Sequence, residues 1–204
     1  GAVSERRPFK LPTTLDASPT LDVDGQRVEF TERGLLPESV RARARQALQT
    51  GEPMRMSIRA LGGHISKPFA FAPEFLQSLD DTAPGSPMFK RVHDGSLLSI
   101  IREPQVEGVI ESARVVDGGL NADIAVHGQE ALREMAMGVA PTYSIQWRSG
   151  PGSTLTCSAC GVPHGSEDCD HWPGDMLDGK RVDMVFGGRG QLIETTRTYT
   201  PAAD

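Results

Sequence analysis

The spacing of apolar residues predicts three short helices. Residues 37–48 begin with proline, which suits a first helical position, and Gly51 follows them as a helix stop. Apolar residues recur at helical spacing in residues 73–79 and again in residues 128–137, where Gly138 supplies the next stop. We therefore expect three short helices, the first of them on the surface.

Other segments have the composition of β-strands. They combine β-branched and apolar residues, and turn sequences such as Asp117-Gly118-Gly119 separate them. Consecutive strands joined by so short a turn predict a β-meander. The expected strands are residues 26–30, 97–102, 108–115, 120–126, 142–148 and 191–199.

These elements predict an α+β, β-rich fold, a barrel or sandwich of mostly antiparallel strands with peripheral helices. Residues 1–30 mix proline, threonine, serine and aspartate, and we expect an extended N-terminal arm. Residues 31–150 and 188–204 would form one β-rich domain. The Ser-Gly-Pro-Gly sequence that ends the strand at 142–148 cannot continue a sheet, so residues 151–187 are expected to be a small insertion.

The charge and hydropathy of the chain do not favour nucleic acid or membrane as a partner. The net charge of -6 and the pI near 5.4 do not favour a nucleic-acid-binding protein, because neutralising phosphates requires clustered lysine and arginine. No apolar run approaches the length of a membrane span, and the N-terminal sequence lacks the apolar core of a signal peptide. We expect a cytosolic protein that binds neither nucleic acid nor membrane.

The insertion contains all three cysteines of the chain. Cys157 and Cys160 have the C-x2-C spacing that directs two thiolates at one metal ion, and Cys169 and His171 add a third thiolate and an imidazole. Three sulfur ligands and one nitrogen ligand predict a closed, structural zinc site. His164 is an alternative fourth ligand. The spacing of Cys157, Cys160, His164 and Cys169 resembles that of a retroviral-type zinc knuckle, but it is one residue short between Cys160 and His164.

Outside the insertion, one serine and one histidine are candidates for nucleophilic catalysis. A serine needs a histidine to accept its proton, and Ser144 and His93 are separated by the predicted meander and the third helix. These elements could return the chain to its starting point. Spacing alone does not distinguish this pair from other serines and histidines.

Residues 93–147 resemble the core of the tailed-phage prohead proteases, which are capsid maturation serine proteases related in fold to the herpesvirus assemblins. That family has a histidine, a Gly-Val strand, an acidic turn with Gly-Leu, a helix, and a serine in a Ser-Ile-Gly-Phe-like strand. The counterparts here are His93-Asp94, Glu107-Gly108-Val109, Asp117-Gly118-Gly119-Leu120 and Ser144-Ile145-Gln146-Trp147. The end of the chain, residues 192–202, is similar in layout to the family's closing Leu-x-Glu-Val-Ser-Leu-Val strand.

The resemblance implies a role for each member of a catalytic triad. Ser144 would be the nucleophile, His93 the general base and acid, and Glu194 the carboxylate that orients the histidine. His127 is an alternative third member, because a second histidine has that role in the herpesvirus enzymes. Some phage proteases of this group also have a Cys-x-x-Cys and Cys-x-His-x-Pro-Gly insertion, which supports His171 as the fourth zinc ligand.

The expected function is that of a capsid maturation endopeptidase that cleaves scaffold and capsid proteins inside an assembling prohead, in the host bacterial cytoplasm. Its partners would be those phage proteins, and homo-oligomers are compatible with this role. The alternative is a non-catalytic capsid or tail assembly protein that keeps the protease-like fold and the structural zinc. That alternative is suggested by Gln146 and Trp147, which replace the family's Gly-Phe.

Overall fold

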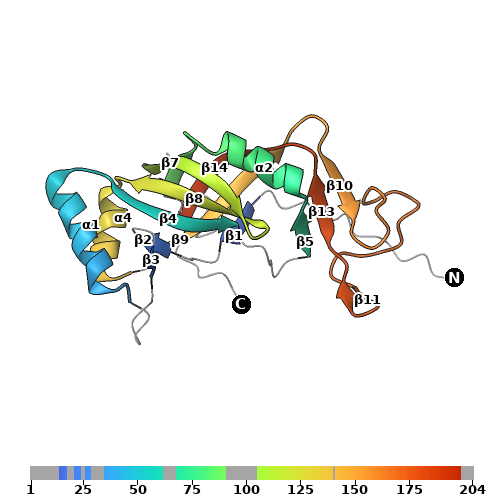
Figure 1. Cartoon of the computed structure of the whole chain (residues 1–204), viewed down its shortest axis with the longest axis horizontal. Coiled ribbons are helices and arrows are strands. Elements are labelled where there is room, and N and C mark those ends of the chain that lie inside the picture. The colour runs from blue at the N-terminus through green and yellow to red at the C-terminus, as the bar shows by residue number, and fades with distance from the viewer. Residues whose placement is uncertain are drawn as a thin grey trace, which may run out of the picture.

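The structure is a computed structural model that describes residues 14–17, 21–23, 26–28, 35–61, 68–90, 105–139 and 141–198. Figure 1 shows an elongated molecule with two helices at one end, a twisted sheet in the middle and the cysteine-containing segment at the other end. Residues 97–102, predicted to be a strand, lie outside the described residues.

The central element is a nine-stranded sheet with the order β1-β9-β14-β6-β7-β8-β4-β2-β3. The pair β14 and β6 is parallel and the other pairs are antiparallel. Because β1 and β3 are its two ends, the described strands form an open sheet and not a closed barrel, and the predicted β-rich α+β class is confirmed. The strands are β1 (Thr14–Ala17), β2 (Leu21–Val23), β3 (Gln26–Arg27), β4 (Met54–Leu61), β6 (Pro87–Lys90), β7 (Gln105–Val116), β8 (Gly119–Val126), β9 (Thr142–Ser149) and β14 (Gly190–Thr198).

The hairpin between β7 and β8 has the turn that its sequence predicts. Asp117 and Gly118 both have positive φ, 48° and 69°, as the two central residues of a type I′ turn require. This turn sets the register in which Val116 pairs with Gly119, and a β-bulge between Ile110 and Ser112 then shifts the register so that Gly108 pairs with Val126. The predicted strands at 108–115 and 120–126 are therefore confirmed as one hairpin.

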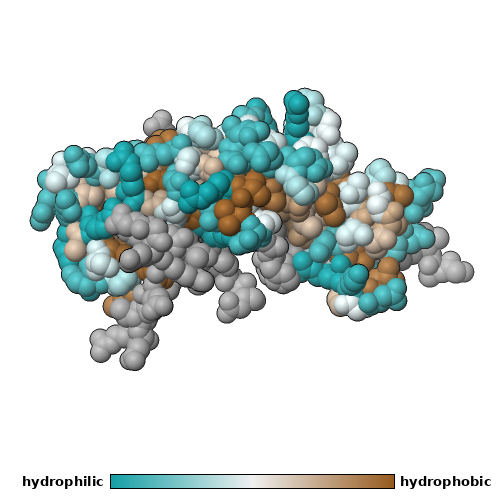
Figure 2. All heavy atoms as spheres, viewed as in Figure 1, coloured by the Kyte–Doolittle hydropathy of each residue, from teal (hydrophilic) through white to brown (hydrophobic). Residues whose placement is uncertain are grey.

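All three predicted helices are present: α1 (Glu38–Thr50), α2 (Pro73–Thr82) and α4 (Gln129–Met137). Gly51 and Gly138 end α1 and α4 in the left-handed conformation, with φ of 74° and 100°. Helix α1 packs against α4, and α2 lies over β14 and β7 (Figure 1). The surface over α1 and α2 is largely hydrophilic in Figure 2. Among the described residues, no helix has the length and apolar character needed to cross a membrane.

A second, three-stranded sheet has the order β10-β13-β5 and contains part of the predicted insertion. Strand β13 pairs antiparallel with β10 and parallel with β5, so residues from the insertion and from the first half of the chain share one sheet. The strands are β10 (Thr154–Cys157), β13 (Met184–Gly187) and β5 (Phe69–Phe71), and a separate hairpin joins β11 (Met176–Leu177) to β12 (Lys180–Arg181).

An aromatic cluster joins the two sheets. The side chain of Trp147, in β9, is 2% exposed, and its ring meets the rings of Phe71 and Phe186 edge-on at centroid distances of 5.5 and 5.6 Å. Phe71 and Phe186 stack on each other at 5.4 Å, and Phe75 of α2 packs against both. Trp147 is therefore a core residue at the junction between the sheets.

A buried ionic cluster joins β14, β7 and α4. The guanidinium of Arg197 is 3% exposed and donates two hydrogen bonds to the carboxylate of Glu107, at 2.6 and 2.7 Å. A further guanidinium nitrogen donates to Glu134. Bidentate geometry of this kind offsets the cost of removing the charges from water.

We expect Arg197→Met to destabilise the protein by about 3–5 kcal/mol, because it leaves Glu107 buried without its cation. Urea unfolding at neutral pH measures the loss. Arg55→Met is the matched control, because the Arg55 pair with Glu111 is largely exposed and such pairs contribute about 0–1 kcal/mol. Similar losses in the two variants would contradict this prediction.

Candidate metal centre and candidate active site

The structure brings together the four residues that the sequence predicts as metal ligands. One ligand atom from each of Cys157, Cys160, Cys169 and His171 lies within 4.8 Å of all the others. The Sγ atoms of Cys160 and Cys169 are 3.7 Å apart. Tetrahedral zinc with Zn–S bonds of about 2.3 Å requires a sulfur–sulfur separation of about 3.8 Å. The cluster can therefore bind a metal ion.

The fourth member of this group is His171, and His164 is not part of it. The Nδ1 atom of His171 is buried and has no hydrogen-bond partner among the described residues. A buried imidazole nitrogen with an unused lone pair is costly unless a proton donor or a cation satisfies it. One ring nitrogen of His171 lies within 4.8 Å of the three thiol sulfurs, where a metal ion could bind it.

The chain folds locally to place the first two thiols on one side. Cys157 ends β10, and its carbonyl accepts a hydrogen bond from the N–H of Gly161 at 2.8 Å. Gly161 has a φ of 73°, which a side chain at that position would make unfavourable. The N–H of Cys157 in turn donates to the carbonyl of Val162 at 3.0 Å. This tight turn brings Cys160 back beside Cys157.

The three thiols lie close enough to influence one another's pKa values. Desolvation raises the pKa of the Cys157 thiol, but hydrogen bonds from the backbone amides of Ala159 and Cys160 and from the other two thiols bring it below its usual value. Desolvation and the neighbouring Cys160 and Cys157 raise the pKa of Cys169. A bound cation would remove the repulsion between the thiolates and lower both values.

The candidate catalytic residues lie partly outside the described structure. His93 lies outside the described residues, and for Ser144 the structure describes the backbone alone. Ser144 belongs to β9 and pairs with Thr196 of β14. Thr196 donates a hydrogen bond from Oγ1 to Oε1 of Glu194 at 3.1 Å, and the Glu194 side chain is buried.

The register of the sheet brings the relevant strands together. Strands β9, β14 and β6 are consecutive in the nine-stranded sheet, with Tyr143 and Lys90 opposite the same residue of β14, Arg197. Lys90 is the last residue of β6 and precedes His93 by three positions. Strand β6 therefore ends at the level of Tyr143, the residue before Ser144.

The alternative third member, His127, has a different position. It follows β8, its side chain is exposed, and its N–H donates to the carbonyl of Glu107 at 2.8 Å. In the strand order, β7 and β6 separate β8 from β14. Glu194 lies closer to Ser144, since β14 pairs directly with β9, and a β-bulge between Leu192 and Glu194 interrupts the register there. Bulges are common where a strand redirects a functional side chain.

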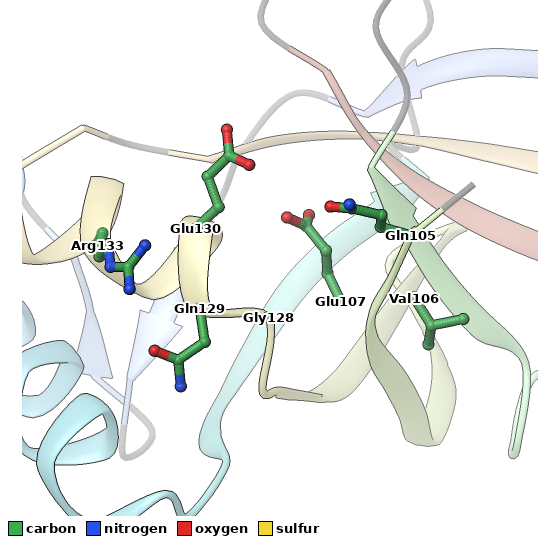
Figure 3. A pocket seen from close by; sticks show the side chains of 7 residues that line it. All are labelled: Gln105, Val106, Glu107, Gly128, Gln129, Glu130 and Arg133. Carbon is green, nitrogen blue, oxygen red and sulfur yellow. The ribbon is translucent and has the colours of Figure 1, made fainter. Parts of the chain in front are cut away.

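A pocket of about 520 Å³ lies between the start of β7 and the first turns of α4. Figure 3 shows the side chains of Glu107, Glu130 and Gln105 converging on the same space, with Arg133 on the other side of α4. Glu107 and Glu130 already bind Arg197 and Lys90. No local sequence pattern predicts this arrangement, because the pocket residues come from β7 and from α4 with its N-cap, and their ionic partners come from β14 and β6.

Comparisons of this chain with protein-family models, with curated proteins and with solved structures found no match. Its function must therefore be inferred from the metal cluster, from the arrangement of β9, β14 and β6, and from the resemblance of its motifs.

Proposed function

We propose that Cys157, Cys160, Cys169 and His171 hold one zinc ion in a structural role. Three thiolates and one imidazole are a ligand set that zinc prefers over magnesium and calcium, which select oxygen. All four positions of a tetrahedron would be filled by the protein, which leaves none for a substrate. The mutual distance of the four ligand atoms, within 4.8 Å, is the observation that supports this proposal.

His171→Ala removes one of the four proposed ligands and should weaken zinc binding strongly. The loss of affinity should exceed the factor of about 10–100 that follows removal of a group hydrogen-bonded to a ligand. Metal analysis and competition with a chromogenic chelator measure the affinity. The matched control is His164→Ala, which changes a histidine of the same module outside the cluster. If His164→Ala loses zinc and His171→Ala keeps it, the ligand assignment is wrong.

We propose further that the chain is a serine endopeptidase of the prohead protease type, acting on capsid and scaffold proteins inside the assembling prohead in the bacterial cytoplasm. The supporting observation is that β9, β14 and β6 are adjacent in the sheet. Strand β9 contains Ser144, β14 contains Glu194, and β6 ends three residues before His93. In the proposed division of the chain, residues 31–150 and 188–204 form the protease domain and residues 151–187 the zinc insertion.

The proposed mechanism is acyl transfer. Ser144 attacks the peptide carbonyl while His93 accepts its proton and then donates it to the leaving amine. Glu194 fixes the tautomer of His93 and stabilises the imidazolium. The hydrogen bond from Thr196 and the burial of Glu194 suit this role, since they hold the carboxylate in one orientation and strengthen its interaction with a cation.

Ser144→Ala should abolish cleavage of a co-expressed capsid or scaffold protein, because removing a serine nucleophile lowers kcat on the order of 10⁶-fold. It should also abolish labelling by a fluorophosphonate. Ser149→Ala is the matched control, since Ser149 is an exposed serine at the end of the same strand, and it should keep both activities. Processing that persists in Ser144→Ala would refute the catalytic assignment.

A non-catalytic assembly role is the second candidate. Gln146 pairs with Glu194 in the register and stands where the resembling family has glycine, which places a side chain beside the proposed carboxylate. Trp147, the other residue that differs from the family pattern, does not favour this candidate, because its side chain is buried in the core against Phe186. A wild-type protein that neither reacts with a fluorophosphonate nor processes its partners would favour the assembly role.

A further inference from the structure

We infer that the metal centre positions β9, the strand that contains Ser144, through a continuous path of contacts that runs from the ligand loops through β13 to Trp147. The metal would then set the geometry of the proposed active strand from a distance. The catalytic consequence rests on the proposed function, but the coupling between the metal and Trp147 does not.

The path begins where the ligand loops contact the residues just before β13. After Cys157, Ser158 donates its N–H to the carbonyl of Asp183 at 2.9 Å and accepts the N–H of Asp183 on Oγ at 2.8 Å. After His171, Gly174 donates to the carbonyl of Val182 at 2.8 Å, and the N–H of Val182 donates to Asp175 at 2.7 Å. One loop therefore holds Asp183 and the other holds the adjacent Val182.

Strand β13 then links the metal centre to the second sheet. Met184, its first residue, pairs with the ligand Cys157 in β10 and with Phe69 in β5. The side chains of Cys157, Val182 and Met184 are all buried. A shift of the ligand loops would therefore displace β13 from both of its neighbours.

The last step is an aromatic contact with β9. Phe186 lies two residues after Met184 and meets Trp147 edge-on at 5.6 Å, and Trp147 lies three residues after Ser144 in the same strand. Close-packed aromatic rings transmit displacement because they have little free volume to absorb it. The position of β9 thus depends on the position of β13.

The metal is needed because the loops have little core of their own. Residues 158–181 are mostly exposed or half-buried, with Cys169 the buried exception. A segment with so little apolar burial depends on its metal for folding free energy. Removing the metal should therefore loosen the hold of the loops on Val182 and Asp183.

The test uses Trp147 as a reporter in the full chain. The chain has two tryptophans, so Trp172→Phe leaves Trp147 as the single one, and Trp172 is neither a ligand nor part of the aromatic cluster. After chelation of zinc, we expect a red shift of the Trp147 emission and severalfold greater quenching by acrylamide. Returning zinc should restore both signals.

Hydrogen exchange measured on the same samples distinguishes a local effect from general unfolding. Metal removal should increase exchange in β13 and β9 and leave β8 unchanged, because β14, β6 and β7 separate β8 from β9 in the strand order. Unchanged emission after verified zinc loss would overturn the inference, and so would equal loss of protection in β8 and β9.

A control variant interrupts the path without touching the ligands. Phe186→Leu in the Trp172→Phe background should bind zinc with unchanged stoichiometry, but chelation should now change the Trp147 signal less. A full response in this variant would overturn the assigned path.

The catalytic consequence has its own readout. Zinc removal should slow fluorophosphonate labelling of Ser144, and zinc return should restore it. If the loaded protein is not labelled at all, the proposed protease function fails while the Trp147 response still decides the coupling. If labelling is normal and independent of zinc, the positioning role fails.

Discussion

The edge-on contact between Trp147 and Phe186 is the interaction on which the arrangement of the molecule depends. It joins β9 of the nine-stranded sheet to β13 of the three-stranded sheet, with Phe71 completing the cluster. The metal-binding segment is joined to the rest of the fold also by the pairing of β13 with β5 and by the packing of α2 against β13. Large aromatic rings suit this position because each buries much apolar surface in a defined orientation.

Strand β14 connects this junction to the buried charges at its other end. Near its start, α2 holds it through hydrogen bonds from the N–H of Gly190 to Ser78 and from the N–H of Leu192 to Thr82, at 2.7 and 3.0 Å. Near its end, Arg197 binds Glu107. Glu194 lies between these two attachments, on a strand that is constrained at both ends. A carboxylate that is proposed to orient a histidine would benefit from such a rigid support.

The two candidate sites have different relations to the fold. The metal cluster is built from residues close together in the sequence, so its geometry depends on two loops. The proposed catalytic strands are brought together by the sheet order, and the parallel pairing of β6 with β14 decides where the chain departs toward His93. The first site can be inferred from local spacing, whereas the second depends on long-range pairing.

The sequence by itself determined the features whose causes are local. Glycine stops ended α1 and α4, the Asp117-Gly118 turn formed the β7–β8 hairpin, and cysteine spacing indicated the metal ligands, because each needs only a few neighbouring residues. Tertiary structure alone decided the partners of Trp147 and Arg197. Phe71 and Glu107 lie far from them in the sequence, and no periodicity encodes a contact between distant segments. The sequence favoured His171 over His164 but left both as chemically acceptable ligands, and only the folded loop decides which imidazole meets the three thiols.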